Sequence, residues 1–351
     1  MAPATQFEAA QPPSDAISAL AFAPSPTPNR FLVSSWDKNV YLYEIADGTE
    51  TVNLINKFEH RAPVLDVCFG ANGDEAFTAG MDRQVIKINL TTGEQTVLSK
   101  HSEPVRCVVY SAQHSLLISA SWDLTLHVHS LSSPSEPLVI NLPGKPHALS
   151  ASPSKLVVAM TARLVHIYDL PTLSSAIQSQ SSAPPTPWQT RESSLKFLTR
   201  AVACMPNDAG YATSSIEGRV AVEWFEDTPE SQARKYAFKC HRQAAPEDEG
   251  GGDIVYPVNA LTFHPVYGTF ASGGGDGTAA LWDAEAKRRM RQYQKFPESV
   301  AALGFSNDGR YLAIACCPGF ETGMEDYSGE GRTHILIREL SETEAKPKGS
   351  K

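Results

Sequence analysis

The stretch "SSWDKNVYLYEI", residues 34–45, places a Trp-Asp pair before a short alternating run. Nearly the same arrangement returns at residues 119–131 as "SASWDLTLHVHSL". Alternation with a period of two is typical of a β-strand with one buried face. A stretch that recurs along a chain indicates a repeated building block rather than a single active site, so the repeat must be mapped first.

Seven short alternating phrases mark this repeat, at spacings of roughly 40 to 60 residues. They are "AISALAFAP" (16–24), "APVLDVCFG" (62–70), "EPVRCVVYS" (103–111), "KPHALSASP" (145–153), "TRAVACMPN" (199–207), "YPVNALTFHP" (256–265) and "ESVAALGFSN" (298–307). A period near 40 residues with a Trp-Asp ending is typical of WD-repeat propeller blades. The sequence therefore predicts an all-β, seven-bladed WD-repeat β-propeller with blades starting near residues 16, 62, 103, 145, 199, 256 and 298.

An aspartate stands at the tight turn of four repeats: Asp37, Asp82, Asp123 and Asp276. We expect each carboxylate to accept hydrogen bonds from the turn amides and from a histidine at the start of the blade. His60 and His101 occupy that position in blades two and three. An aromatic residue six positions after the aspartate, Tyr43 or Trp282, is expected to complete the packing of its blade.

The last repeat lacks a fourth strand, which the N-terminal segment "ATQFEA" can supply. Such a strand would close the ring and remove a free sheet edge. We expect one propeller over residues 1–340 and a disordered tail at 341–351. Three segments without periodicity are expected to be loops: Ser/Pro-rich 172–190 between blades four and five, acidic and Gly-rich 243–255 before blade six, and 318–333 inside blade seven.

Composition favours a soluble intracellular protein. The 351 residues are 42% hydrophobic and carry a formal net charge of −9, which argues weakly against general nucleic-acid binding. No secretory signal and no apolar run of ~20 residues is visible. The six cysteines include no CxxC pair, so we expect buried thiols rather than disulfides or a zinc site.

Motifs of catalysis are absent from the sequence. It contains no GxSxG, GxxxxGK[ST] or HExxH. The phrase "GGGDG" (273–277) resembles a phosphate loop, but no helix follows and a hairpin turn explains it better. The "HVH" at 127–129 alternates across a strand and is read as structural. We therefore expect no enzyme, no cofactor and no metal site.

One region is basic within this acidic chain. Between residues 191 and 242 stand Arg191, Lys196, Arg200, Arg219, Lys235, Lys239 and Arg242. Local clustering against the overall charge suggests an anionic partner. The alternative, that these charges are scattered, solvated and without function, stays open.

The same region carries a family resemblance. "RESSLK", "SSIEGRVAVEW", "YAFKCHR", "YPVNALTFHP" and "SNDGRYLAIA" resemble the mitotic checkpoint propeller family Bub-three (Bub3). "LVSSWDKNVYLYE" and "SASWDLTLHVHS" are similar to its first and third blades, and the likeness runs from about residue 14 to 348. The messenger-RNA export propeller family Rae-one (Gle-two) is a relative that shares "SIEGRVA" and "FKCHR".

The resemblance implies a non-catalytic adaptor of the spindle assembly checkpoint. Members of that family bind a short acidic segment, the GLEBS motif, of the kinase Bub-one and its paralogue BubR-one (Mad-three). The complex docks on phosphorylated Met-Glu-Leu-Thr repeats of the kinetochore scaffold and delays anaphase through the assembly that inhibits the anaphase-promoting complex. The resemblance implies a location in the nucleus, and at kinetochores in mitosis, without membrane or direct nucleic-acid contact.

The positions that match the family's motif for binding the partner peptide are Trp36, Met81, Trp122, Arg219 and Lys239. Arg219 and Lys239 are also the candidates for contacting phosphothreonine. Their chemistry suits this role, because indole rings offer contact area at low ordering cost and an arginine fork captures carboxylate or phosphate. Core packing of the two tryptophans is an alternative, and which cation meets phosphate and which meets carboxylate stays open.

Two other functions remain as alternatives. The first is a propeller of messenger-RNA export that binds a nucleoporin. The second is a substrate receptor of a ubiquitin ligase that uses the same propeller face. An enzyme is the least favoured class.

Overall fold

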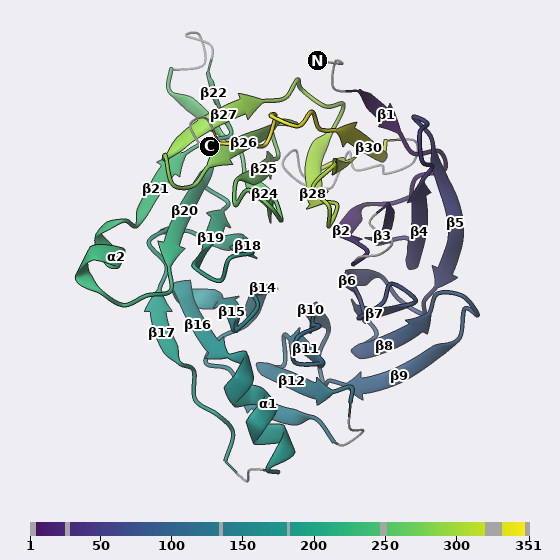
Figure 1. Cartoon of the computed structure of the whole chain (residues 1–351), viewed down its shortest axis with the longest axis vertical. Coiled ribbons are helices and arrows are strands. Elements are labelled where there is room, and N and C mark those ends of the chain that lie inside the picture. The colour runs from purple at the N-terminus through teal and green to yellow at the C-terminus, as the bar shows by residue number, and fades with distance from the viewer. Residues whose placement is uncertain are drawn as a thin grey trace.

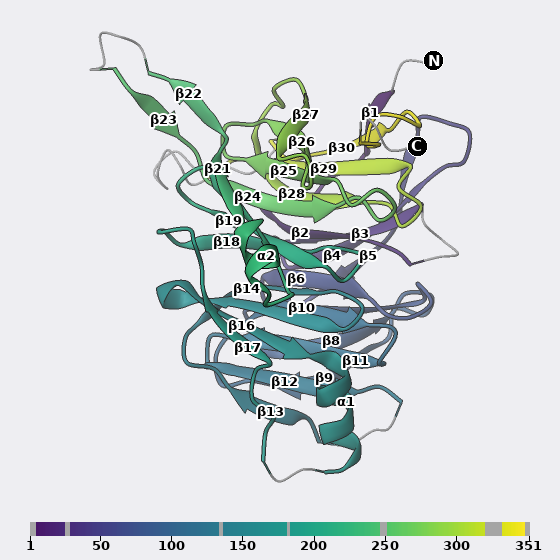
Figure 2. The same cartoon turned by 60° about the vertical axis from the view of Figure 1, so that its left-hand side comes forward.

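The computed structural model describes residues 5–24, 29–132, 136–180, 183–245, 251–319 and 332–347. In this part of the chain, seven four-stranded antiparallel sheets surround a central axis like the blades of a propeller (Figure 1). A two-stranded hairpin projects from the ring (Figure 2). The seven-bladed all-β propeller predicted from the repeat is confirmed.

Blades one to three are built from consecutive strands, and the first strand of each lies nearest the axis (Figure 1). Blade one is β2 (Ile17–Phe22), β3 (Arg30–Ser35), β4 (Asn39–Ile45) and β5 (Val52–Glu59). Blade two is β6 (Val64–Phe69), β7 (Glu75–Gly80), β8 (Gln84–Asn89) and β9 (Gln95–Lys100). Blade three is β10 (Val105–Ser111), β11 (Leu116–Ser121), β12 (Thr125–Ser130) and β13 (Leu138–Asn141).

Blades four to six follow the same order. Blade four is β14 (Pro146–Ala151), β15 (Lys155–Met160), β16 (Leu164–Asp169) and β17 (Gln189–Glu192), with a 3-10 turn η1 (Thr161–Arg163) before β16. Blade five is β18 (Thr199–Cys204), β19 (Gly210–Ser215), β20 (Arg219–Trp224) and β21 (Tyr236–Lys239). Blade six is β24 (Val258–Phe263), β25 (Phe270–Gly274), β26 (Ala279–Asp283) and β27 (Arg288–Gln292).

Blade seven is assembled from both ends of the chain. Its three C-terminal strands are β28 (Ser299–Phe305), β29 (Tyr311–Cys317) and β30 (His334–Glu339), and its fourth is the N-terminal β1 (Gln6–Glu8). β1 pairs with β30 in antiparallel register, with Phe7 opposite Ile337. The predicted closure of the ring by the N-terminal segment is therefore confirmed.

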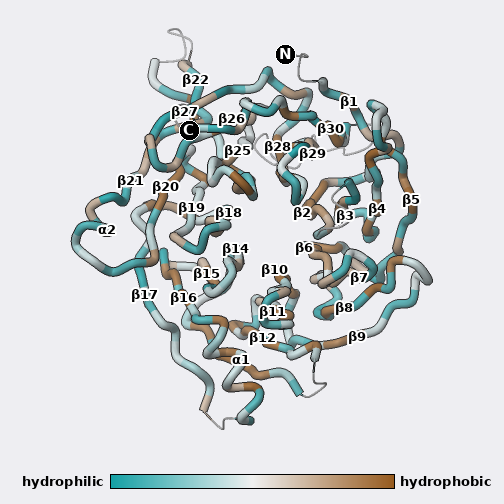
Figure 3. Tube along the Cα trace, viewed as in Figure 1, coloured by the Kyte–Doolittle hydropathy of each residue, from teal (hydrophilic) through white to brown (hydrophobic). Residues whose placement is uncertain are grey.

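The hydrophobic core is divided among the spaces between blades. Seven buried apolar clusters occur in the described residues, and each draws on two neighbouring blades. The second strands supply much of this core, since β11 and β19 are buried over their whole length. Accordingly, apolar stretches are distributed around the ring rather than gathered on one side of it (Figure 3). Because a blade buries both faces only between two neighbours, closure of the ring stabilises every blade.

Blade six contains the most complete polar network of the WD type. The His241 ring joins Asp276 Oδ1 through Nδ1 and Ser272 Oγ through Nε2, both at 2.9 Å. Trp282 Nε1 donates to the same Ser272 Oγ at 2.9 Å. These groups are almost fully buried, and their mutual hydrogen bonds offset the cost of burial.

The expected pairs between histidine and turn aspartate are found in part. His101 Nδ1 lies 3.1 Å from Asp123 Oδ2, as expected. His60, by contrast, bonds the Phe58 carbonyl and Thr78 Oγ1, while Asp82 accepts from the Gln84 amide. The Phe58 carbonyl has thus taken the place of the aspartate at Nδ1, and Thr78 occupies the position of Ser119 in blade three.

The predicted loop at 172–190 between blades four and five is wrong. Helix α1 (Leu170–Gln178) begins the segment and β17 ends it as the fourth strand of blade four, so the insertion lies inside that blade. Asp169 caps the helix by accepting from the Thr172 amide, and Leu170 and Leu173 are buried against blades three and four. Two buried leucines in nine residues leave only a weak helical period in a Ser-rich sequence.

The segment 243–255 was expected to be a loop and is instead partly a hairpin. β22 (Arg242–Ala244) pairs with β23 (Asp253–Val255), with Gln243 opposite Ile254. Residues 246–250 between them lie outside the described residues. In the third predicted loop, 318–333, all but residues 318, 319, 332 and 333 lie outside them as well.

The predicted disordered tail, 341–351, is wrong for residues 341–347, and the remainder lies outside the described part of the chain. Ala345 is 1% exposed, and its carbonyl accepts from Thr269 Oγ1 at 2.8 Å. The Glu344 side chain is also 1% exposed and lies 2.8 Å from Arg338 Nε. A polar composition suggested solvation, but the glutamate pairs with the half-buried Arg338 and the alanine joins the core between blades six and seven.

Helices are short in this molecule. Besides α1, the described residues form α2 (Pro229–Ala233), which Thr228 caps through its hydroxyl. None of the helices in the described ranges is long and apolar enough to cross a bilayer.

Candidate partner-binding face

A β-bulge interrupts the first strand of every blade near its start. The pairing register skips one residue in six of these strands and two, Arg200 and Ala201, in β18. A bulge re-aims the side chain of the residue it leaves unpaired. The bulged residues are Ser18, Leu65, Arg106, His147, Arg200, Asn259 and Ala301.

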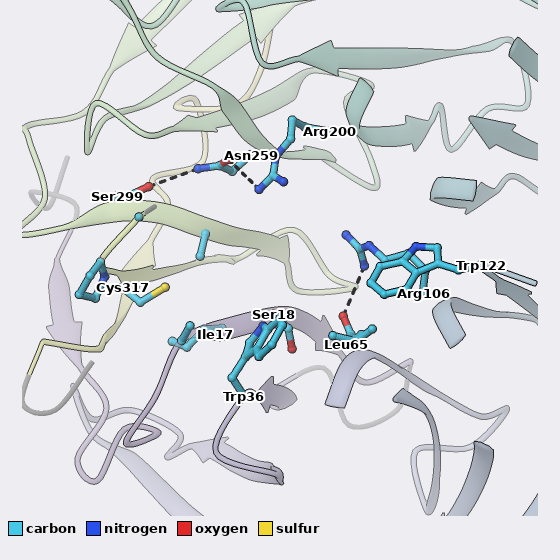
Figure 4. A pocket seen from close by; sticks show the side chains of 14 residues that line it. Ile17, Ser18, Trp36, Leu65, Arg106, Trp122, Arg200, Asn259, Ser299 and Cys317 are labelled. Carbon is cyan, nitrogen blue, oxygen red and sulfur yellow. Dashed lines mark hydrogen bonds between the residues drawn. The ribbon is translucent and has the colours of Figure 1, made fainter. Parts of the chain in front are cut away.

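Six of these side chains line one pocket at the centre of the ring (Figure 4). Only His147 is not part of the lining. Trp36 and Trp122 complete the wall of the pocket from the hairpins of blades one and three, and Arg200 lies across the pocket from Trp36 (Figure 4). The pocket thus combines two indoles with two guanidinium groups.

The hairpins that carry the tryptophans are equivalent in six blades. In each, the residue after the second strand donates its backbone N–H to the carbonyl just before or at the start of the first strand, for example Trp36 to Ala16 at 2.9 Å and Trp122 to Pro104 at 3.0 Å. The residues at this position are Trp36, Met81, Trp122, Thr161, Ile216 and Gly275. The structure therefore places the predicted Trp36, Met81 and Trp122 at one structural position around the ring.

The tryptophans are accessible rather than core residues. The side chain of Trp36 is 39% exposed and Trp122 is half-buried. Met81 is also half-buried, but it does not line the central pocket. This exposure argues against the core-packing alternative for the two tryptophans.

Hydrogen bonds hold the two arginines in the pocket wall. Arg200 donates from Nε and Nη2 to Asn259 Oδ1 at 3.2 and 3.0 Å, and Asn259 in turn bonds Ser299 Oγ. Arg106 Nη1 lies 3.5 Å from the Leu65 carbonyl oxygen (Figure 4). These hydrogen-bond acceptors are neutral, whereas the half-buried Asp66 carboxyl group also interacts electrostatically with Arg106.

The positive charge of the two arginines also affects the pKa of His147. Burial lowers the pKa of His147, and the nearby Arg106 and Arg200 lower it further. The imidazole is therefore neutral at physiological pH. An anion placed between the two arginines would be attracted by both.

Sequence reasoning missed most of this pocket. Arg106, His147 and Asn259 were not singled out, and Arg200 was noted only as one of a basic series. A signal was available, because each of them stands near the third position of its repeat phrase, as in "PVR", "PVN" and "KPH". Aligning the seven phrases at that position would have grouped them.

Arg219 and Lys239 lie together, but outside the lining of the central pocket. They are directly opposite each other in the register of β20 and β21. Lys239 is exposed, and Arg219 Nε lies 3.6 Å from Glu217 Oε2 without reaching a hydrogen bond. The five predicted residues thus form a tryptophan group at the centre and a cationic pair on blade five, with Met81 on the blade between the tryptophans.

An apolar patch accompanies the cationic pair. Phe197 is 54% exposed, Leu198 44% and Ile216 41%. The Ile216 amide donates to the Leu198 carbonyl, and a side chain at Gly218 would touch Val255 of the projecting hairpin, which is itself 38% exposed. Exposed apolar residues gathered at one place mark a contact surface. The patch joins the blade-five hairpin to β22–β23.

Three other cations of the basic series have structural partners. Arg191 donates to the Trp224 and Phe225 carbonyls and lies 3.5 Å from Glu223, which Lys235 also approaches at 3.6 Å. Arg242 donates to the Glu217 carbonyl. These three cations are therefore better explained as structural charges than as parts of a partner-binding site.

The sequence predicted buried thiols and no metal site, and the described residues bear on both expectations. All six cysteines are free thiols, four of them buried, and burial raises the pKa of the Cys107 thiol to about 12. Within the described ranges, no group of three His, Cys, Asp or Glu side chains is arranged to hold a metal ion.

Comparison with known proteins follows this geometry. The model of the WD domain, G-beta repeat, matches residues 93–130 and 254–283. The chain is 43% identical to the mitotic checkpoint protein BUB3.1 of Arabidopsis thaliana, over 99% of this chain and 96% of the relative. It is 34% identical to the mitotic checkpoint protein bub3 of Dictyostelium discoideum (97% of each) and 31% identical to the mRNA export factor GLE2 of Chaetomium thermophilum (98% and 92%).

The fold and the candidate site together define a WD-repeat β-propeller whose central pocket combines accessible tryptophans with arginines. Propellers of this class are generally non-catalytic scaffolds. Over nearly its whole length, the chain belongs to the Bub3 family of mitotic checkpoint proteins.

Proposed function

We propose that this protein is a non-catalytic adaptor of the spindle assembly checkpoint. It binds the GLEBS motif of the kinase Bub-one and of BubR-one (Mad-three), and it docks them on phosphorylated Met-Glu-Leu-Thr repeats of the kinetochore scaffold. In this role it acts in the nucleus and at kinetochores, and it delays anaphase as part of the assembly that inhibits the anaphase-promoting complex. The observation that carries the proposal is the central pocket of Trp36, Trp122, Arg106 and Arg200.

The pocket suits a short acidic segment with apolar residues. Trp36 and Trp122 supply apolar contact area from two blades, and burying part of an exposed indole favours binding. Arg106 and Arg200 offer planar forks to a carboxylate, and Asn259 already holds the Arg200 fork in place. A preorganised fork loses less side-chain entropy on binding.

The cationic pair on blade five suits the phosphorylated residue. Arg219 and Lys239 are opposite each other on β20 and β21, so both positive charges can contact one phosphate dianion. The apolar patch of Phe197, Leu198 and Ile216 provides contact area for the apolar residues of a Met-Glu-Leu-Thr repeat. Phosphorylation should therefore strengthen binding without changing the apolar contacts.

Calorimetry with the full chain and a GLEBS peptide of the kinase tests the pocket. We expect Arg106→Gln and Arg200→Gln to weaken binding by about tenfold each, the loss of one charge-assisted hydrogen bond. Arg310→Gln is the matched control, because Arg310 is a partly exposed arginine paired with Glu339 at the opposite end of a blade. Full affinity of both pocket variants would contradict the proposed site.

Similarity to the export factor GLE2 supports a second candidate, a propeller of messenger-RNA export that binds a nucleoporin. Affinity purification from mitotic and interphase cells separates the two functions. A checkpoint kinase in the mitotic eluate supports the checkpoint adaptor. Nucleoporins and RNA without the kinase would instead favour the export role.

A further inference from the structure

The outer strand of blade six is unusually basic. β27 and its flanks contain Lys287, Arg288, Arg289, Arg291 and Lys295 within nine residues that include no acid, in a chain of net charge −9. All five side chains are exposed. β27 itself contains three arginines, whereas the outer strands of the other blades contain at most one lysine or arginine each. With flanks counted, β21 of blade five also carries four cations within residues 234–242, so positive charge is concentrated on the rims of blades five and six.

β27 also has a free edge. It is the last strand of its sheet and pairs only with β26 among the described strands, and it lies on the outer rim (Figure 1). An edge strand presents unpaired N–H and C=O groups that another extended chain can pair with. The strand thus offers backbone hydrogen bonds and charge together.

The cations project to both sides of this edge. Arg291 is opposite Leu281, which packs towards blade seven, whereas Arg289 is opposite Trp282, which packs towards blade five. Lys287 lies over the Tyr236 ring of blade five at 5.1 Å. Lys287 lies in the turn before β27, and the pairing register shifts between Arg289 and Arg291, so these cations do not form one regularly spaced row along the strand.

Two nearby acids, Glu285 and Glu344, have partners of their own, and a third, Asp283, is the register partner of Arg288 on the adjacent strand. Glu285 pairs with Arg234 at 2.6 Å, and the buried Glu344 pairs with Arg338 at 2.8 Å and lies 3.5 Å from Arg291. Arg289 donates to the neutral Gln292 side chain. The exposed cations on the blade-five side, Lys287 and Arg289, keep their surplus charge.

The chemistry favours a protein segment over nucleic acid. Single-stranded nucleic acid is bound by exposed aromatic platforms as well as cations, but Trp282 and Tyr293 beside β27 are 8% and 7% exposed, and Tyr236 under Lys287 is half-buried. An acidic peptide can use both the strand edge and the cations beside it.

We propose that β27 is a docking edge for an acidic segment of a partner protein, which adds to blade six as a fifth strand. This surface lies on the rim of blade six, whereas the central pocket lies at the axis and the pair Arg219 and Lys239 lies on blade five. The main-chain ladder supplies affinity, and the cations of β27 and its flanks select an acidic segment.

Fluorescence anisotropy with the full chain and a labelled (Glu-Thr)₅ peptide tests the charge requirement. We expect the double variant Lys287→Glu/Arg289→Glu to weaken binding by about tenfold or more, since two attractive contacts become repulsive. Lys57→Glu, on the outer strand of blade one, is the matched control and should bind as the unaltered protein does. Equal affinity of the double variant and the control would overturn the proposal, provided that circular dichroism shows both folded.

Two further probes test the mode of binding and the class of partner. A (Glu-Thr)₅ peptide N-methylated at alternate residues keeps its charge but cannot complete a strand ladder, so we expect it to lose most of its affinity. Unchanged affinity would overturn strand addition. Tighter binding of a single-stranded RNA 12-mer than of the peptide would overturn the assignment to a protein. Trp36→Ala should retain peptide binding, which keeps this test independent of the proposed function.

Discussion

Arg219 and Lys239 are register partners on β20 and β21, and the carboxylate of Glu217 lies 3.6 Å from the Arg219 Nε. The arginine is thus in contact with an internal anion while its partner lysine is exposed to solvent. The Glu217 side chain is only 17% exposed, which strengthens its attraction for the neighbouring guanidinium. An external anion at this pair must compete with Glu217.

Charge reversal at Arg219 should abolish the selectivity for phosphate. We expect Arg219→Glu to weaken binding of a phosphorylated Met-Glu-Leu-Thr peptide to the partner-loaded protein by about 10- to 100-fold, the value of one or two charge-assisted hydrogen bonds. Lys239→Glu should act in the same direction. Calorimetry with phosphorylated and unphosphorylated peptides measures the effect, and Arg310→Glu is the control. Full affinity of Arg219→Glu would remove this residue from the site.

Removing the competing carboxylate should have the opposite effect. Glu217→Gln leaves the Arg219 fork without its internal anion, so we expect the phosphorylated peptide to bind about two- to fivefold more tightly. The same calorimetric titration measures it. Weaker binding by Glu217→Gln would show that the glutamate positions the arginine rather than competing for it.

Exposed tryptophans at the centre of the ring should contribute more to peptide binding than an exposed tryptophan on its rim. We expect Trp36→Ala and Trp122→Ala each to weaken binding of a GLEBS peptide by about 2–3 kcal/mol, as buried aromatic anchors do at interfaces. Trp188→Ala is the matched control, because Trp188 is 48% exposed but lies beside β17 and contacts Lys155. Surface plasmon resonance would measure all three. Losses as large for Trp188 as for the other two would contradict the assignment.

The fold could be predicted from the sequence because the repeat encodes it many times. Each blade repeats a turn aspartate or an alternating run, so the decay of one copy, such as the missing turn aspartate of blade four, leaves the period intact. Helix α1 could not be predicted in this way. Its stability depends on burying Leu170 and Leu173 against neighbouring blades, and this is a tertiary contact with no local period.

The docked segment 341–347 was missed for a similar reason. Its sequence is polar, and only the meeting of Glu344 with Arg338, and of Ala345 with the core between blades six and seven, orders it. Only part of the candidate site could be predicted from the sequence. Trp36 and Trp122 belong to motifs that can be read locally, whereas Arg106 and Arg200 meet only because bulges in separate blades turn them towards one axis.

The Glu344 contact should contribute to the stability of the propeller. Glu344→Ala leaves Arg338, whose side chain is 14% exposed, without its carboxylate partner, so we expect a loss of about 2–4 kcal/mol in the free energy of unfolding. Urea denaturation measures this loss. Glu342→Ala, an exposed neighbour in the same segment, is the control and should change stability by less than about 0.5 kcal/mol. Equal effects of the two variants would show that the segment adds no stability through Glu344.

The pH dependence of stability should reveal His129. Burial lowers the pKa of His129 to about 4, with a further contribution from His101, and its buried Nε2 atom has no hydrogen-bond partner among the described residues. Because the folded pKa lies below the usual 6.5, the unfolded chain binds more protons between pH 6.5 and 4. The stability is therefore complete above pH 6.5 and is lost as the pH falls through this window.

His129→Leu removes this titration while keeping an apolar side chain at a 7% exposed position. Between pH 7 and pH 5, we expect the free energy of unfolding of the unaltered protein to fall by about 1–2 kcal/mol more than that of the variant. Urea denaturation at the two pH values measures the difference. Histidines with lowered pKa that do not interact with His129, among them His60 and His264, still titrate in both proteins and contribute equally to both. Parallel losses in the two proteins would show that His129 is not buried in its neutral form, because a group that titrates alike in both states adds no pH dependence.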